Sequence, residues 1–193
     1  MLTKSQLRTH FRSVREQIPP KQKLDAATHA ANLFNKQFLK NTSFKIACYL
    51  ATPEEFETLF IIKKILLANH ACYLPWVDTN SKEMKFILYD IGDVLQPNQY
   101  SILEPMNHSQ TIAPKDLDIV LLPLVAYDLQ GNRLGMGAGY YDKALAFLKE
   151  STQKSPLILG IGYEAQLAEN IPADPWDVKL HGVLTEKEIK RFL

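Results

Sequence analysis

Hydrophobic positions along the chain follow helical spacing in some segments and form short continuous runs in others. Near the N-terminus, Leu7, Phe11, Val14 and Ile18 keep the spacing of one helix face. They follow Thr3-Lys4-Ser5-Gln6, a sequence that fits a helix-capping box. This pattern predicts an amphipathic helix that begins near Thr3.

The same two patterns alternate through the rest of the chain. A second helix is expected after Pro19-Pro20, with an apolar stripe of Leu24, Ala27, Ala31, Phe34 and Phe38. Strands are expected over residues 44–51, 71–74, 84–89, 118–126, 157–162 and 183–184, and further helices over residues 56–69 and 143–149. Thr185-Glu186-Lys187-Glu188 fits a second capping box, which predicts a terminal helix.

Strands that alternate with helices favour a single α/β domain over residues 1–193. We expect a three-layer α/β/α architecture with a mostly parallel sheet and helices on both faces. The run 118–126 is almost continuously apolar, as in a strand covered on both sides. Ligands of such folds bind beyond the carboxyl ends of the strands.

Composition narrows the classes of protein. A formal net charge of +1 argues against a nucleic-acid-binding protein. The chain has no apolar run of the roughly 20 residues that a membrane span needs, and its polar, basic start does not resemble a signal peptide. Cys48 and Cys72 lie in apolar runs without metal-binding spacing, which predicts buried thiols and a cytoplasmic location.

The most informative stretch runs from Gly131 to Asp142, between an apolar strand and a helical pattern. Glycines alternate at positions 135, 137 and 139, which suggests positive φ angles or close approach to a ligand. Arg133 and Asp142 flank them, so the stretch offers backbone amides, a cation and a carboxylate for a polyphosphate and its magnesium ion. It is neither a P-loop nor a dinucleotide fingerprint. The alternative is that the stretch is only a tight connection between the strand and the helix and binds no ligand.

Charged residues elsewhere allow two interpretations. The basic face of the first helix, with Lys4, Arg8, Arg12 and Arg15, is either solvated or directed at an anion through Lys4 and Arg8. The acidic segment 53–58 either favours a helix N-terminus or presents a carboxylate to a polar substrate.

Other metal and nucleophile chemistry has less support. Asp174 and Asp177 are either turn residues or, with Asp142, oxygen ligands of magnesium. The histidines form no zinc-binding pair, and no Gly-x-Ser-x-Gly elbow is present.

Gly-Asn-Arg-Leu-Gly-x-Gly-x-Gly-Tyr-Tyr-Asp, residues 131–142, resembles the signature of the 5-formyltetrahydrofolate cyclo-ligase family, and the resemblance extends over nearly the whole chain. Several other motifs resemble that family in the same order. They are Lys4-x-x-x-Arg8, Tyr49-Leu50 with Glu55-Phe56-Glu57-Thr58, Leu103-Glu104-Pro105, Asp118-Ile119-Val120, Asp177-Val178-Lys179-Leu180 and Val183-Leu184-Thr185-Glu186.

The resemblance implies a reaction in which ATP and 5-formyltetrahydrofolate give ADP, phosphate and 5,10-methenyltetrahydrofolate, with magnesium as cofactor. It implies that Arg133 and Lys4 act in catalysis and that Asp142 and Asp177 hold the metal. The implied ATP contacts are Lys4, Arg8, Arg133, Leu134, Gly135, Met136, Gly137, Ala138, Gly139, Tyr140 and Tyr141. The implied folate contacts are Leu50, Glu55, Glu57, Met136, Gly137, Ala138, Gly139 and Tyr140. Between the two glutamates we favour Glu55 as the pterin contact.

Two positions depart from the family pattern. Ala138 stands where many relatives carry glycine, and Trp76 stands where a basic residue is frequent. We expect a monomer that acts on these small molecules, with no nucleic-acid or membrane partner. The alternatives are a binding module without catalysis, or an unrelated α/β enzyme such as a sugar-phosphate isomerase or CoA transferase, for which fold alone is weak support.

Overall fold

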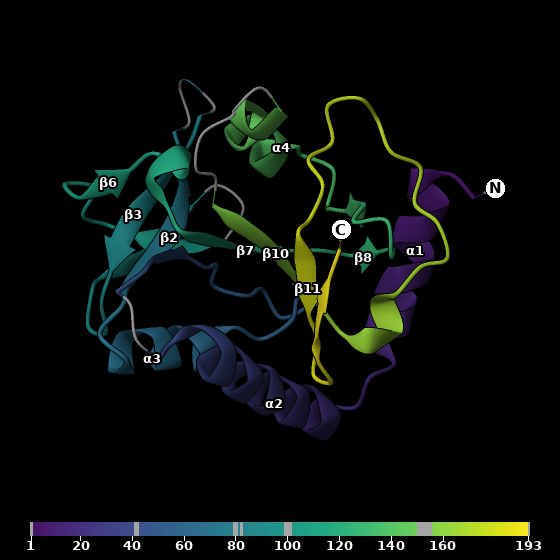
Figure 1. Ribbon diagram of the computed structural model, residues 1–193, viewed down its shortest axis with the longest axis horizontal. Coiled ribbons are helices and arrows are strands. Elements are labelled where there is room, and N and C mark those ends of the chain that lie inside the picture. The colour runs from purple at the N-terminus through teal and green to yellow at the C-terminus, as the bar shows by residue number, and fades with distance from the viewer. Residues whose placement is uncertain are drawn as a thin grey trace.

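An eight-stranded mixed sheet forms the centre of the structure (Figure 1). The computed structural model describes residues 2–40, 43–78, 81, 83–98, 102–149 and 156–192. The order of strands across the sheet is β12-β11-β10-β7-β1-β2-β3-β6. Their bounds are Lys45–Ala47 (β1), Ala71–Val77 (β2), Met84–Tyr89 (β3), Thr111–Ile112 (β6), Ile119–Pro123 (β7), Leu157–Ile161 (β10), Gly182–Leu184 (β11) and Ile189–Arg191 (β12).

Strand direction separates the middle of the sheet from its edges. β11, β10, β7, β1 and β2 run parallel to one another, whereas β12, β3 and β6 pair antiparallel. In β7, Ile119 and Leu121 face one hydrophobic cluster while Val120 and Leu122 face the other. The predicted α/β fold with a mostly parallel sheet is confirmed. The prediction that the apolar run 118–126 is covered on both faces is confirmed for its β7 part.

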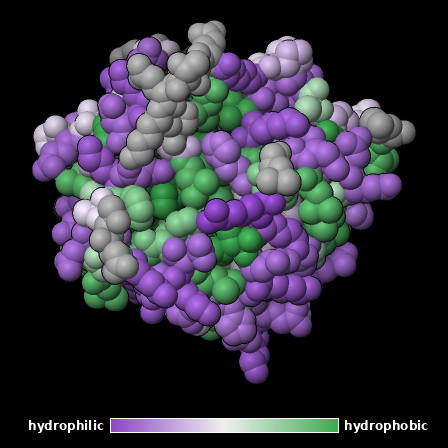
Figure 2. All heavy atoms as spheres, viewed as in Figure 1, coloured by the Kyte–Doolittle hydropathy of each residue, from purple (hydrophilic) through white to green (hydrophobic). Residues whose placement is uncertain are grey.

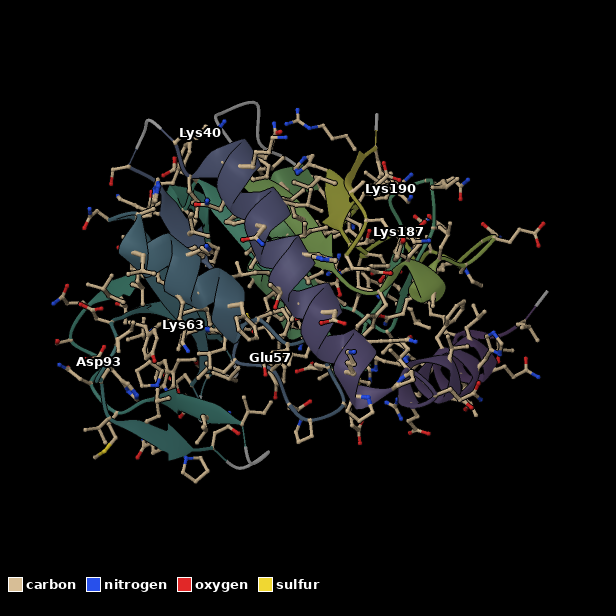
Figure 3. All side chains as sticks on the ribbon, turned by 90° about the horizontal axis from the view of Figure 1, so that it is seen from below. Lys40, Glu57, Lys63, Asp93, Lys187 and Lys190 are labelled. Atoms are coloured by element: carbon tan, nitrogen blue, oxygen red, sulfur yellow. The ribbon has the colours of Figure 1, made fainter. Side chains whose placement is uncertain are left out.

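Two helices cover one face of the sheet. Helices α2 (Pro20–Phe38) and α3 (Leu59–Leu67) lie side by side across it, which Figure 3 shows from below. The small residues Ala27 and Ala31 of α2 are buried, so the helix approaches the sheet closely. Their side chains join Ile46 of β1 and Ile62 of α3 in one cluster.

The opposite face carries helical turns that follow the glycine segment. Helix α4 (Tyr140–Ala144) and the 3₁₀ helix η2 (Ala146–Lys149) pack Tyr141, Leu145 and Phe147 against Phe86 and Leu122 of the sheet. Helices therefore lie on both faces, as predicted. The side of the molecule that Figure 2 shows is mostly hydrophilic, and apolar atoms appear chiefly near the middle of the view.

Helix α1 (Lys4–Glu16) packs away from the main sheet. Leu7 and Phe11 contact Ala126 and Leu134, which belong to the small hairpin of β8 (Ala126–Tyr127) and β9 (Arg133–Leu134). The capping box at Thr3 is present as predicted: its hydroxyl accepts from the amide of Gln6, and the Gln6 side chain accepts from the amide of Thr3. The start of the chain is thus fastened onto the hairpin that leads into the glycine segment.

The remaining regular elements are short. Strands β4 (Leu95–Pro97) and β5 (Leu103–Pro105) form a two-stranded hairpin. The 3₁₀ helices η1 (Pro114–Asp116) and η3 (Glu164–Gln166) lie before β7 and after β10. Three residues are too few for hydrophobic periodicity to register, so these elements were not predicted.

The predicted terminal helix is wrong. Thr185 does cap a turn, because its hydroxyl accepts from the amides of Lys187 and Glu188, but its own amide donates to the carbonyl of Glu188. The chain therefore reverses and adds β12 to the sheet. Lys190 of β12 then bonds Glu164 at 2.9 Å, which attaches the new strand to the turn after β10. A local capping motif was overridden by tertiary pairing.

Other predictions need adjustment. The strand predicted over 44–51 is regular only in β1, the helix predicted over 56–69 begins at Leu59, and the run 118–126 is divided at Pro123 between β7 and β8. The helix predicted over 143–149 is replaced by α4 and η2. Leu24, a member of the predicted apolar stripe of α2, is exposed. Arg15, a member of the basic face of α1 that could be solvated, is buried beside Glu54.

Cys48 and Cys72 are both free and buried, as predicted. Burial raises the pKa of the Cys48 thiol to about 12, which keeps it protonated and unreactive. Among the described residues, no helix is both long enough and apolar enough to cross a bilayer.

Candidate active site

Three distant segments meet beside the β8–β9 hairpin: helix α1, the glycine segment 131–142 and the loop 170–180. Leu7 of α1, Leu134 of β9 and Ile171 of the loop share one apolar cluster. Polar contacts between the same segments surround this cluster. The glycine segment begins after the carboxyl end of β7, where an α/β fold was expected to bind its ligand.

Two of the three alternating glycines have the predicted positive φ, and Gly135 does not. Gly137 and Gly139 have φ angles of 114° and 69°, a region that other residues rarely adopt. Gly131 also has a positive φ, 81°, and a β-carbon there would lie 2.8 Å from the carbonyl oxygen of Leu180. The absence of a side chain at Gly131 lets the two backbones approach, and the amide of Leu180 donates to the carbonyl of Gly131 at 2.8 Å. The segment is therefore joined to the C-terminal loop by its own backbone.

A buried carboxylate organises the turn before the glycines. Asp128 is fully buried, and its oxygens accept hydrogen bonds from the amides of Gln130 and Asn132 and from the Asn132 side chain. It also accepts from the amide of Ile171 at 3.0 Å. One side chain thus fixes the start of the glycine segment and the start of the C-terminal loop together.

Arg133 and Asp142 bracket the glycines and contact each other. The guanidinium Nη2 lies 2.7 Å from Asp142 Oδ1, and the same carboxylate oxygen accepts from the amide of Val178 at 3.0 Å. The second terminal nitrogen of Arg133 donates to the carbonyl of Val178. Only 6% of the Arg133 side chain is exposed, so the pair is largely shielded from solvent. The two ends of the glycine segment and residue 178 are held at one point.

Lys4 forms a second charged cluster with the C-terminal loop. Its ammonium lies 2.6 Å from Asp174 Oδ2 and 2.7 Å from Asp177 Oδ2. Burial alone would lower the pKa of Lys4, but the hydrogen bonds to both aspartates outweigh it, and the pKa lies above the ordinary value. Burial alone would raise the pKa of Asp177, but the Asp174 amide and Lys4 outweigh it, and that pKa lies below the ordinary value.

These shifts determine when the cluster is charged. Asp177 adds stability above the ordinary carboxyl pKa, which is lost as the pH falls, and Lys4 adds stability that is lost only as the pH rises through its raised pKa. The pair is therefore intact across the neutral range. Arg133 also lowers the pKa of Asp177 by its charge, which links the two clusters.

Other arginines of α1 lie against the glycine segment. Arg8 Nε donates to the carbonyl of Gly135 at 2.9 Å, and its guanidinium would lie 3.8 Å from a β-carbon at Gly137. Arg12 Nη2 lies 3.6 Å from Met136 Sδ. The helix face is thus directed at the glycine segment and is not simply solvated. Lys4 and Arg8 contact different partners, so their shared-anion role stays a prediction.

The segment that follows β1 approaches the same region. Burial raises the pKa of the Tyr141 hydroxyl, with a further contribution from the negative charge of Glu55 and an opposing one from Arg133. Glu55 has the same effect on buried Tyr49. The negative charge of Glu55 therefore acts on Tyr141, at the end of the glycine segment. Glu55 also accepts from the amide of Thr52 at 3.0 Å.

Each of the two candidate glutamates of this segment accepts a hydrogen bond from a backbone amide. Glu57 Oε1 accepts from the amide of Leu59 at 2.8 Å, which is the helix-stabilising role that an acidic residue plays at an N-terminus. Leu50 is half-buried against the cluster beneath α2 and α3. The preference for Glu55 as the pterin contact stays a prediction.

Sequence reasoning missed several contributors to the site. Asp128, the loop contact of Arg12 and the pairing of Asp174 with Lys4 were not assigned. Asp128 did leave a signal, because a lone carboxylate between an apolar strand and a Gly-Asn turn commonly accepts backbone amides. The pairing across 170 residues between Lys4 and Asp174 left none.

Fold and site define an α/β protein with a glycine segment at the carboxyl end of a central strand and paired cations and carboxylates around it. The chain matches the model of the 5-formyltetrahydrofolate cyclo-ligase family over residues 1–186, and it belongs to this family.

Individual relatives span almost the same length. The chain is 35% identical over 187 residues to 5-formyltetrahydrofolate cyclo-ligase of Haemophilus influenzae. The alignment covers 94% of this chain and 96% of that protein. The chain is 28% identical over 181 residues to the Escherichia coli protein of the same name, covering 93% and 98%. The solved NMR structure of Aquifex aeolicus 5,10-methenyltetrahydrofolate synthetase has a TM-score of 0.82 at 27% identity, covering 98% of this chain and 93% of that one.

The Asp128 contacts predict a large loss of stability on truncation. Asp128→Ala removes the acceptor for four hydrogen bonds in a fully buried position, so we expect the free energy of unfolding to fall by about 2–4 kcal/mol. Asp128→Asn keeps one acceptor oxygen and should lose less. Urea unfolding measures both. Asp25→Ala, at an exposed position of α2, is the matched control and should change stability by less than about 0.5 kcal/mol. A wild-type midpoint for Asp128→Ala would contradict the organising role.

Proposed function

We propose that this chain converts 5-formyltetrahydrofolate to 5,10-methenyltetrahydrofolate with ATP, releasing ADP and phosphate. The family match supports the folate reaction. The observation that carries the ATP requirement is the pair of charged clusters around the glycine segment, Arg133 with Asp142 and Lys4 with Asp174 and Asp177. Cations at a glycine-rich backbone suit a polyphosphate, and carboxylates suit its counter-ion.

The chemistry needs a phosphoryl transfer because the formyl group is amide-like and its oxygen leaves poorly. The γ-phosphorus forms a bond to the formyl oxygen while its bond to the ADP oxygen breaks. N10 of the folate then attacks the formyl carbon, the carbon–oxygen bond breaks, and phosphate leaves with that oxygen. The N10 proton is lost to phosphate or water. The protein has mainly to align the substrates and stabilise the transferring charge.

Arg133 is the proposed stabiliser of the transferring phosphoryl group. Its guanidinium is already oriented by Asp142 and the Val178 carbonyl, so little reorganisation is needed when charge develops. Lys4 is the proposed second cation. In this structure the Lys4 ammonium bonds two carboxylates, and a phosphate would exchange with them. Arg8, the residues 134–139, Tyr140 and Tyr141 complete the proposed ATP contacts.

Magnesium fits the oxygen donors of the two clusters. Among the described residues, no group of three or more acidic, histidine or cysteine side chains converges as a self-sufficient metal site. Magnesium does not require one, because it is commonly held by one or two carboxylates together with substrate phosphates. Asp142 accepts from the amide of Val178, the residue after Asp177, so both aspartates belong to the contact between the glycine segment and the C-terminal loop. When bound, magnesium would neutralise phosphate charge.

The folate is proposed to lie on the side of Glu55 and Tyr141. Glu55 would accept hydrogen bonds from the pterin, and Glu57 is the less favoured alternative for that role. Leu50, Met136 and Tyr140 would contribute apolar surface. The Tyr141 hydroxyl is neutral at physiological pH, since the ordinary tyrosine pKa is about 10 and burial raises it further, so it can donate a hydrogen bond but adds no charge beside the transferring phosphoryl group.

One assay tests the function directly. Purified protein is mixed with magnesium, ATP and 5-formyltetrahydrofolate, and the near-ultraviolet absorbance of the methenyl product is followed. We expect a rise that requires protein, ATP and magnesium together. No rise, with both ligands bound, would indicate a binding module without catalysis. Absence of binding by either ligand would refute the proposal.

Asp142→Asn tests the metal role, and urea unfolding checks that the variant stays folded, because the change also removes the carboxylate that pairs with Arg133. Asparagine keeps an oxygen that can accept from Val178 and Arg133 but loses the negative charge. We expect turnover at subsaturating magnesium to fall by about 100-fold or more. The exposed Asp116→Asn in η1 makes the same chemical change and should leave the rate unchanged. Wild-type magnesium dependence in Asp142→Asn would remove this residue from the metal site.

Lys4→Ala tests the N-terminal anchor. It removes charge-assisted hydrogen bonds, so we expect the ATP KM to rise about 10-fold or more with a smaller change in the folate KM. Lys21→Ala, at an exposed position of α2, is the control. Steady-state kinetics with each substrate varied in turn measures both constants. An unchanged ATP KM would place Lys4 outside the nucleotide site.

A further inference from the structure

Trp176 is the most exposed aromatic residue that lies next to the charged clusters. Its side chain is 65% exposed, and it stands directly before Asp177, whose Oδ2 is 2.7 Å from Lys4 Nζ. On the other side, the carbonyl of Pro175 accepts a hydrogen bond from Lys149 of η2. The indole therefore projects from a point of the loop that is fastened on both sides.

The backbone around the indole forms a closed turn. The amide of Asp177 donates to the carbonyl of Asp174 at 3.0 Å, and the amide of Asp174 donates to Asp177 Oδ2 at 2.9 Å. A large apolar group held outward by such a turn loses little conformational entropy when a ligand packs on it. This position is therefore prepared for a flat partner.

The other tryptophan of the chain is in a different situation. Trp76 is half-buried; its ring centroid lies 4.4 Å from that of His108, and the Lys85 ammonium lies 5.9 Å from it. Isolated exposed apolar residues are common, and Leu67 and Val94 are also exposed on this protein. Trp176 differs from them because it stands directly before Asp177, whose carboxylate lies 2.7 Å from the Lys4 ammonium.

We propose that Trp176 is the platform on which the nucleobase of the bound nucleoside triphosphate stacks. This inference rests on the proposed function, because it takes Lys4 as a phosphate contact. A nucleotide whose α-phosphate reaches Lys4 carries its base one ribose further on, and Trp176 offers an exposed aromatic surface one residue from Asp177, the partner of Lys4. Since every base has a π-face, this contact supplies affinity for any base.

Base and phosphate contributions are separated by comparing ATP with inorganic tripolyphosphate, which lacks the base. In Trp176→Ala we expect the ATP KM to rise roughly 5- to 150-fold, the range for loss of one base stack. The inhibition constant of tripolyphosphate against ATP should stay at the wild-type value. Trp176→Phe keeps an aromatic ring and should recover most of the ATP affinity.

Fluorescence provides an independent measurement. In Trp76→Phe, Trp176 is the only tryptophan, so stacking of the base should quench its emission on addition of ATP, while tripolyphosphate should change it little. Equal quenching by both ligands would contradict stacking.

The outcomes separate this inference from the proposed function. If wild-type protein turns over ATP and Trp176→Ala has an unchanged ATP KM, the stacking role is refuted and the proposed function stands. If ATP and tripolyphosphate weaken equally in Trp176→Ala, the indole only supports the Asp177 loop and the inference is again refuted. If wild-type protein binds neither ligand, both proposals fail.

Discussion

The Asp142 carboxylate, shared between the Arg133 guanidinium and the Val178 amide, is the interaction on which the arrangement of this site depends. It joins both ends of the glycine segment to the C-terminal loop, and only 6% of its arginine partner is exposed. Loss of one partner from a largely buried pair leaves the other charge unsatisfied and costs about 3–5 kcal/mol. Fixing the two ends restricts the conformational freedom that the glycines between them would otherwise have.

The cluster of Lys4, Asp174 and Asp177 joins the N-terminal helix to the C-terminal loop, as Asp142 and Arg133 join the glycine segment to that loop. Lys4 connects α1 to Asp174 and Asp177, and Arg8 connects α1 to Gly135. Lys4 and Arg8 are thereby oriented before any ligand arrives, and the charge of Lys4 is balanced by two carboxylates. When a polyphosphate and a divalent ion bind, the phosphate oxygens can replace the carboxylates as partners of the cations. The metal ion can then bind the carboxylates that are released. Paired charges explain how one site can hold several cations without repulsion.

Much of the fold was predictable because its signals are periodic and long. The buried run around β7, the amphipathic α1 with its Thr3 cap and the small-residue face of α2 were evident from the sequence. Thr185 misled the prediction, because its cap geometry is real but β12 pairs with β11 at long range. The glycine segment and its flanking Arg133 and Asp142 were also evident. The contacts of Asp128 with Ile171 and of Lys4 with Asp174 depend on the tertiary fold and have no local signature.

The central claim is that the formyl oxygen is phosphorylated at this site, and the fate of that oxygen tests it most directly. Substrate labelled with ¹⁸O in the formyl group is converted with unlabelled ATP, and the inorganic phosphate is analysed by mass spectrometry. The account predicts that each phosphate released carries one labelled oxygen, because the carbon–oxygen bond breaks only after the phosphoryl group has been attached. Unlabelled phosphate, with the label found in water, would contradict it.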